Sequence, residues 1–104
     1  MLEIKDLRSL CRDESIVITK HARVRLTERG IAVADIQSAV QTGEIIRQYE
    51  DDKPFPSCLL LGLTELGKYI HVAASVDGGY LYIITAYYPG ENEWELDLKT
   101  RKGR

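Results

Sequence analysis

Three segments in the first part of the chain carry apolar residues at about every third or fourth position. This spacing places apolar side chains on one face of a helix. The helices predicted in this way span residues 2–12, 20–29 and 33–42. Thr19 is a suitable N-cap for the second helix, because its hydroxyl can accept a backbone N–H of the first turn, and Gly30 is a suitable C′ residue.

A brief strand is predicted over residues 16–18, and after Gly43 the pattern changes to that of β-strands throughout. The strands predicted there span residues 44–50, 57–64, 69–76 and 80–88. The segment Pro54–Pro56 is expected to form a turn, since proline donates no hydrogen bond to a ladder. A further edge segment anchored by Trp94 is expected over residues 91–98, followed by a flexible basic tail over residues 99–104.

This order of elements predicts one α+β domain that spans residues 1–104. We expect the N-terminal helices to pack on one face of a four-stranded antiparallel sheet. The four strands of that sheet are the ones predicted between residues 44 and 88. No internal repeat or linker divides the sequence.

The hairpin between the last two strands decides which side chains share a face of the sheet. A two-residue Gly78-Gly79 loop pairs His71 with Ala86, whereas a three-residue loop that includes Asp77 pairs His71 with Thr85. We favour the three-residue loop, because glycine can supply its left-handed position and because this register gathers polar groups.

The charge of the chain is unevenly distributed. The formal net charge is −2, which argues against a protein that coats nucleic acid by bulk electrostatics. Residues 19–29 nevertheless carry a net +3, and residues 99–104 carry a net +4, whereas residues 30–98 carry a net −8. The positive helix can therefore attract an anion locally.

Other features exclude several classes of protein. The longest unbroken apolar stretch is the five residues Tyr80 to Ile84, and the all-leucine run Leu59-Leu60-Leu61 is shorter still; both are far short of the roughly 20 residues that span a bilayer. The N-terminus lacks the pattern of a signal peptide, so we expect a cytoplasmic protein without a membrane partner. Cys11 and Cys58 are isolated, so we expect two reduced thiols, no zinc site and no cofactor.

The second predicted helix carries the first set of candidate functional residues. His21, Arg25 and Arg29 follow one another at intervals of four and form one stripe. The helix dipole and the neighbouring cations, Lys20 among them, disfavour a protonated imidazole at His21. A neutral imidazole beside guanidinium groups can take a proton from a hydroxyl while the arginines hold a phosphate.

The sheet carries the second set of candidates. His71 lies on the strand over residues 69–76, and Thr85 and Tyr87 share one face of the last strand. In the favoured register His71 lies on that same face, so the three side chains form one polar group. The simpler alternatives stay open: the helical stripe can be a solvated face, and His71 can be a structural histidine.

Separated motifs along the chain resemble the domain-of-unknown-function family DUF4258. The matching residues, in chain order, are Ile18 to Ala22, Arg25, Arg29 to Ile31, Asp35 and Ile36, Gly43 to Ile46, Tyr49, Pro54 to Ser57, Ile70 to Val72 and Ile84 to Tyr87. They cover about residues 17 to 88. The family looks like a branch of the barnase, EndoU, colicin and RelE-like group of small ribonucleases.

The resemblance implies a RelE/ParE-like fold and a metal-independent endoribonuclease, the toxin of a toxin–antitoxin pair. Its implied substrate is RNA, either mRNA or tRNA, cleaved by attack of the 2′-hydroxyl on its own phosphate, and its implied partner is an antitoxin protein. The residues implied to act in catalysis are His21, His71, Thr85 and Tyr87. The residues implied to bind phosphate are Lys20, Arg25 and Arg29.

Two alternatives from other classes of function remain beside this one. A non-catalytic domain of the same fold would bind a protein or an anionic ligand and would need the arginines but not the histidines. An antitoxin-like or assembly partner would use Trp94 and an exposed edge strand.

Overall fold

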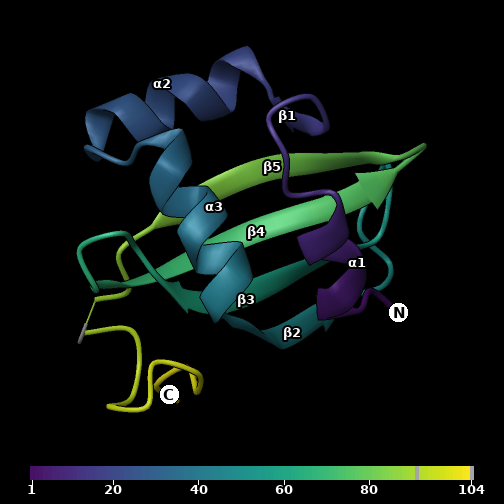
Figure 1. Ribbon diagram of the computed structural model, residues 1–104. Coiled ribbons are helices and arrows are strands. Elements are labelled where there is room, and N and C mark those ends of the chain that lie inside the picture. The colour runs from purple at the N-terminus through teal and green to yellow at the C-terminus, as the bar shows by residue number, and fades with distance from the viewer. Residues whose placement is uncertain (91, 104) are drawn as a thin grey trace.

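The structure is a computed structural model that describes residues 1–90 and 92–103. Figure 1 shows helices on one side of a twisted sheet. The elements are α1 (Ile4–Ser9), β1 (Ile16–Ile18), α2 (Lys20–Glu28), α3 (Val33–Thr42), β2 (Glu44–Tyr49), β3 (Ser57–Leu63), β4 (Tyr69–Asp77) and β5 (Tyr80–Tyr87). The α+β class expected from the sequence is therefore confirmed.

The sheet has five strands in the order β1-β5-β4-β3-β2. Strands β2 to β5 pair antiparallel, as expected, but β1 pairs parallel with β5 from Ile16↔Leu81 to Ile18↔Ile83. The expectation of four antiparallel strands was therefore wrong in this detail. The sequence predicted a strand at Ile16–Ile18, but a three-residue segment does not specify its partner, which is set by backbone pairing at the edge of β5.

Helices α2 and α3 cover one face of the sheet (Figure 1), and the hydrophobic core lies between these helices and the sheet. It is formed by side chains such as Leu26, Ile36, Val40, Leu60, Val72 and Ile83. α3 passes so close to β3 that a Cβ atom added at Gly62 would collide with the main chain of Ala39. Gly62 is thus needed for the close approach of α3 to the sheet.

Two helix predictions compare differently with the structure. The helix predicted from Lys20 begins as expected, since the Thr19 hydroxyl accepts the Ala22 N–H at 3.2 Å and Gly30 adopts a φ of 69°. The first helix spans only Ile4–Ser9 instead of residues 2–12. Its start is displaced because the backbone of Leu2 is hydrogen bonded to the Gln48 side chain.

The hairpin between β4 and β5 follows neither predicted register throughout. Asp77 pairs with Tyr80, so the loop is the two-residue Gly78-Gly79 turn and the favoured three-residue loop was wrong. A β-bulge then shifts the register between Ala73 and Ala74, and His71 consequently pairs with Tyr87.

The extra residue in this bulge is Ile84. Because it offsets the pairing by one position, His71 shares its face with both Thr85 and Tyr87, as the sequence analysis expected for a different reason. This face is opposite to the one that α2 and α3 cover, because the neighbouring Val72 points into the helix-side core.

The C-terminal segment folds back instead of adding an edge strand to the sheet. Trp94 and Arg101 form an isolated antiparallel bridge, and the Lys102 N–H donates to the Glu93 carbonyl at 2.9 Å. We call residues 93–102 the C-terminal hairpin. The expected flexible tail is thus held in its first part, with Lys99 Nζ 2.6 Å from Glu44 Oε1. Glu91 and Arg104 lie outside the described residues.

Candidate functional site

We call the face of β4 and β5 that carries His71, Thr85 and Tyr87 the polar face. His71 lies on this face and is fully buried. Its Nε2 is 2.7 Å from the main-chain oxygen of Leu98, in the C-terminal hairpin, and its Nδ1 is 3.3 Å from the Tyr87 hydroxyl. The Trp94 ring packs edge-on against the imidazole, with ring centroids 4.4 Å apart. Both ring nitrogens are therefore engaged, and the ring is held on two sides.

These contacts define the tautomer of His71. A carbonyl oxygen only accepts hydrogen bonds, so Nε2 must carry the proton. In the neutral ring Nδ1 is then an acceptor, and the Tyr87 hydroxyl donates to it. Burial lowers the pKa of His71, although the hydrogen bond to Leu98 opposes this shift, so the neutral form is the ground state.

Tyr87 forms the exposed side of this pair, since it is only half-buried. Burial raises the pKa of Tyr87, and the neighbouring Tyr49 raises it further. The positive charges of Arg101 and Arg29 act in the opposite direction. Glu93 raises the pKa again, so the pKa of Tyr87 is raised overall and the two guanidinium groups offset only part of the shift. The phenol is hydrogen bonded to the neutral imidazole of His71.

Arg29 reaches this face around the edge of β5. Its Nη1 donates to the Thr85 hydroxyl at 3.1 Å and to the Ala86 carbonyl at 2.8 Å. The edge is open there because β1 pairs with β5 only as far as Ile83. The structure thus brings together four residues of the predicted site, namely Arg29, His71, Thr85 and Tyr87.

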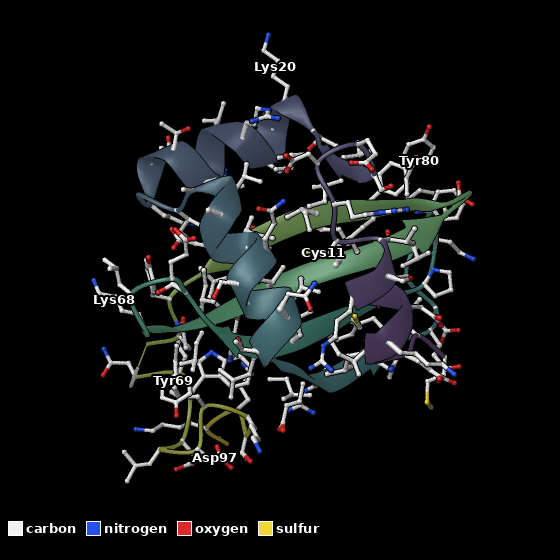
Figure 2. The ribbon with its side chains drawn as sticks, in the orientation of Figure 1. Cys11, Lys20, Lys68, Tyr69, Tyr80 and Asp97 are labelled. Carbon is white, nitrogen blue, oxygen red and sulfur yellow. The ribbon has the colours of Figure 1, made fainter. Side chains whose placement is uncertain are left out.

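The remaining predicted residues lie elsewhere. His21, Lys20 and Arg25 are exposed on α2, and Arg25 Nη1 is 3.7 Å from Glu28 Oε1. In Figure 2 the Lys20 side chain extends away from the body of the molecule, at the end opposite to Asp97 of the C-terminal hairpin. His21 and Arg25 are thus exposed on a helix that covers one face of the sheet, whereas His71 lies on the opposite face, and of the stripe only Arg29 contacts that face.

No hydrogen bond or ion pair among the described residues joins His21 or Arg25 to His71, so a catalytic or phosphate-binding role for these two α2 residues stays a prediction. Periodicity correctly placed the two α2 residues on one stripe, but it carried no information on which face of the sheet His71 would take. Surface hollows of about 300 to about 690 Å³ occur elsewhere on the described part of the chain, and neither the one lined by Gln48 to Asp52 nor the one lined by Lys20, Arg23, Val24, Thr27 and Glu28 includes His21, Arg25 or His71.

Three residues near the His71–Tyr87 pair were not predicted as site residues: Trp94, which packs against His71, and Tyr49 and Arg101, whose charges act on Tyr87. The Arg101 guanidinium lies 5.7 Å from the centroid of the Trp94 ring, in a cation–π contact. A lone tryptophan seven residues before an arginine was the available signal. This signal is weak, because an edge segment over residues 91–98 followed by a flexible tail over residues 99–104 accounts for the same sequence.

The two thiols add little to the site. Burial raises the pKa of Cys58 to about 11 and also raises that of Cys11, and both thiols are free. Among residues 1–90 and 92–103, no three His, Cys, Asp or Glu side chains gather as metal ligands do. No helix in this part of the chain is long and apolar enough to cross a membrane.

Comparison with known families supports the resemblance found in the motifs. No curated protein and no solved structure matches the chain. The family described as "Domain of unknown function (DUF4258)" matches residues 18–88, from the end of β1 to just beyond β5. The C-terminal hairpin lies outside the matched segment. Since the match covers more than half of its 104 residues, the chain belongs to the DUF4258 family.

Proposed function

We propose that this protein is a metal-independent endoribonuclease of RelE-like type, the toxin of a toxin–antitoxin pair. The observation that carries the proposal is the Tyr87 hydroxyl, which donates to the neutral His71 ring at 3.3 Å, with the positive charges of Arg29 and Arg101 near it although burial raises the pKa of this phenol. This arrangement supplies a proton acceptor and two phosphate-binding cations on one face.

The chemistry uses the ribose 2′-hydroxyl as the nucleophile. Tyr87 accepts the proton of that hydroxyl and passes its own proton to His71 Nδ1, whose protonated ring is bonded to the Leu98 carbonyl. The 2′ oxygen attacks the adjacent phosphorus, and the bond to the 5′ oxygen breaks as that oxygen takes a proton from solvent. Protonated His71 then returns one proton through the Tyr87 hydroxyl to solvent, which restores the pair. Arg29 and Arg101 stabilise the charge that develops on the phosphate.

Cleavage of a single-stranded RNA tests this proposal directly. We expect fragments that end in a 2′,3′-cyclic phosphate and a 5′-hydroxyl, no cleavage of DNA of the same sequence, and unchanged rates in EDTA. Tyr87→Phe should lower kcat by about 10²-fold or more, since it removes the proton acceptor. Tyr80→Phe is the matched control, because Tyr80 lies at the far end of the same strand.

A comparison of His21→Ala with Tyr87→Phe decides whether the catalytic residues lie on α2 or on β4 and β5. If His21 is catalytic, as the family resemblance implies, His21→Ala abolishes both cleavage and the growth arrest expected on expression. If the Tyr87–His71 pair is catalytic, His21→Ala keeps both, whereas Tyr87→Phe loses both. Wild-type protein that leaves RNA and growth untouched contradicts the endoribonuclease proposal.

One observation favours the alternative of a non-catalytic anion- or protein-binding domain. Both nitrogens of His71 have protein partners and the ring is fully buried, as in a structural histidine. A binding domain predicts that Arg29→Met weakens RNA or partner binding, whereas Tyr87→Phe leaves binding intact. Binding without cleavage by the wild type would favour this alternative.

A further inference from the structure

The C-terminal hairpin is closed by its own backbone and by one carboxylate. The Glu95 N–H donates to the Thr100 carbonyl at 2.8 Å, and the bridge between Trp94 and Arg101 continues this pairing. At the tip, Asp97 Oδ1 accepts the N–H groups of Lys99 and Thr100 at 2.9 and 3.0 Å. These bonds hold the turn around Leu98 in one conformation.

Leu98 itself adopts a left-handed backbone with a φ of 60°. It is the one non-glycine residue with a positive φ among residues 1–90 and 92–103. Leucine disfavours this conformation, so the surrounding bonds must impose it. In this conformation the Leu98 carbonyl accepts the hydrogen bond of His71 Nε2.

The hairpin is attached to the sheet on both sides of Leu98. Lys99 forms an ion pair with Glu44 of β2, and the Trp94 ring packs edge-on against His71. Tyr69 and Asp97 line the same hollow of about 510 Å³ between the hairpin and the sheet, and Figure 2 shows both at this end of the molecule. The Leu98 carbonyl is therefore anchored relative to β4 as well as within the hairpin.

We infer that the C-terminal hairpin positions the catalytic pair, with the strained Leu98 presenting its carbonyl to His71 and Asp97 holding the turn that presents it. This inference rests on the proposed function. The carbonyl fixes the proton on Nε2, so Nδ1 faces the Tyr87 hydroxyl as an acceptor. It also accepts a shorter, charge-assisted hydrogen bond when His71 takes up the proton of the reaction.

The matched segment of the DUF4258 family ends at residue 88 and so lacks this carbonyl. The family domain alone thus contains His71 and Tyr87 but not the group that orients them. Leu98 and Asp97 are positioning residues in this scheme, because Leu98 acts through His71 and Asp97 acts through the turn that holds Leu98.

Two substitutions at one position separate the backbone conformation from the side chain. Glycine adopts a positive φ readily, so Leu98→Gly should keep the carbonyl in place and retain activity within about twofold. Proline fixes φ near −65° and lacks the N–H that donates to the Glu95 carbonyl, so Leu98→Pro should turn the carbonyl away. We expect Leu98→Pro to lower kcat on the order of 10²-fold with little change in KM.

Imidazole NMR of the full-length chain reads the positioning without using activity. The chain has two histidines, and exposed His21 serves as the internal reference. The wild type and Leu98→Gly should show a slowly exchanging Nε2 proton for His71, which Leu98→Pro should lose. Asp97→Ala should reduce this protection in a protein whose circular dichroism is unchanged, whereas Asp97→Asn, which keeps Oδ1, should restore most of it.

The outcomes separate this inference from the proposed function. If Leu98→Pro loses the protected proton but cleaves RNA at the wild-type rate, the hairpin does not position the reaction and the inference is overturned. It is equally overturned if the His71 proton stays protected in Leu98→Pro. If the wild type cleaves no RNA, the proposed function fails, and the positioning of a reaction fails with it, even where the protected proton is found.

Discussion

His21 and His71 occupy opposite environments at the scale of single residues. His21 is exposed on α2, whereas His71 is buried with both ring nitrogens bonded. Alternation along β4 predicts that His71 and Val72 point to opposite faces, and this is confirmed. Which of the two faces also holds the helices depends on contacts between distant segments, so the sequence did not reveal it.

The burial of His71 predicts a pH dependence of stability. Its pKa in the folded protein lies below the ordinary value of 6.5, so below about pH 6.5 the unfolded chain binds a proton that the folded protein does not. The free energy of unfolding should therefore fall as the pH drops toward the folded pKa, by up to about 1.4 kcal/mol per pH unit. Above pH 6.5 both states are neutral at His71 and the effect vanishes.

Urea unfolding between about pH 5.5 and 7.5 measures this effect. His21→Asn should keep the slope and His71→Asn should lose it, although the latter protein is less stable at every pH because a buried ring and its hydrogen bonds are removed. A slope that disappears with His21 instead would contradict the assignment.

At the scale of elements, the bulge at Ile84 determines the composition of the polar face. The short Gly78-Gly79 turn sets one register near the loop, and the bulge changes it before the strands reach His71. Hairpin signals in the sequence predicted a hairpin and both strands, although the favoured loop was one residue too long. They did not predict the bulge, because an extra residue in one strand depends on how both strands pack against the rest of the protein.

The contact between α3 and the sheet yields a prediction about stability. Gly62→Ala should lower the free energy of unfolding by roughly 1–3 kcal/mol, because the new Cβ would collide with the Ala39 main chain and α3 would have to shift. Gly90→Ala is the matched control, since nothing lies within 4 Å of a Cβ at that position. Equal stabilities of the two variants in chemical denaturation would show that α3 adjusts freely.

At the scale of the whole molecule, the charge is divided between surfaces. The exposed cations Lys20 and Arg25 lie on α2, whereas Arg29 and Arg101 approach the polar face from two directions. The net charge of −2 argues against broad electrostatic binding of a nucleic acid. If the polar face binds RNA as proposed, we expect it to hold about one or two phosphates.

This distribution predicts a weak dependence of RNA binding on salt. For a single strand, each neutralised phosphate contributes a slope of about −0.7 to the plot of log affinity against log salt, so we expect a slope between about −0.7 and −1.4. Fluorescence anisotropy with catalytically inactive Tyr87→Phe measures it, and Arg29→Met should make the slope shallower. A slope of about −4 or steeper would indicate a wide basic surface instead.

The sequence by itself determined the local structure: the cap at Thr19, the stop at Gly30, the order of helices and strands, and the alternation of His71 with its neighbours. These features depend on residues close together in the chain. The tertiary structure decided the parallel pairing of β1, the bulge, the separation of His21 from His71, and the docking of the C-terminal hairpin on His71. Each of these is a pairing between distant segments, whose free energy depends on the packing of the whole fold and not on any one stretch of sequence.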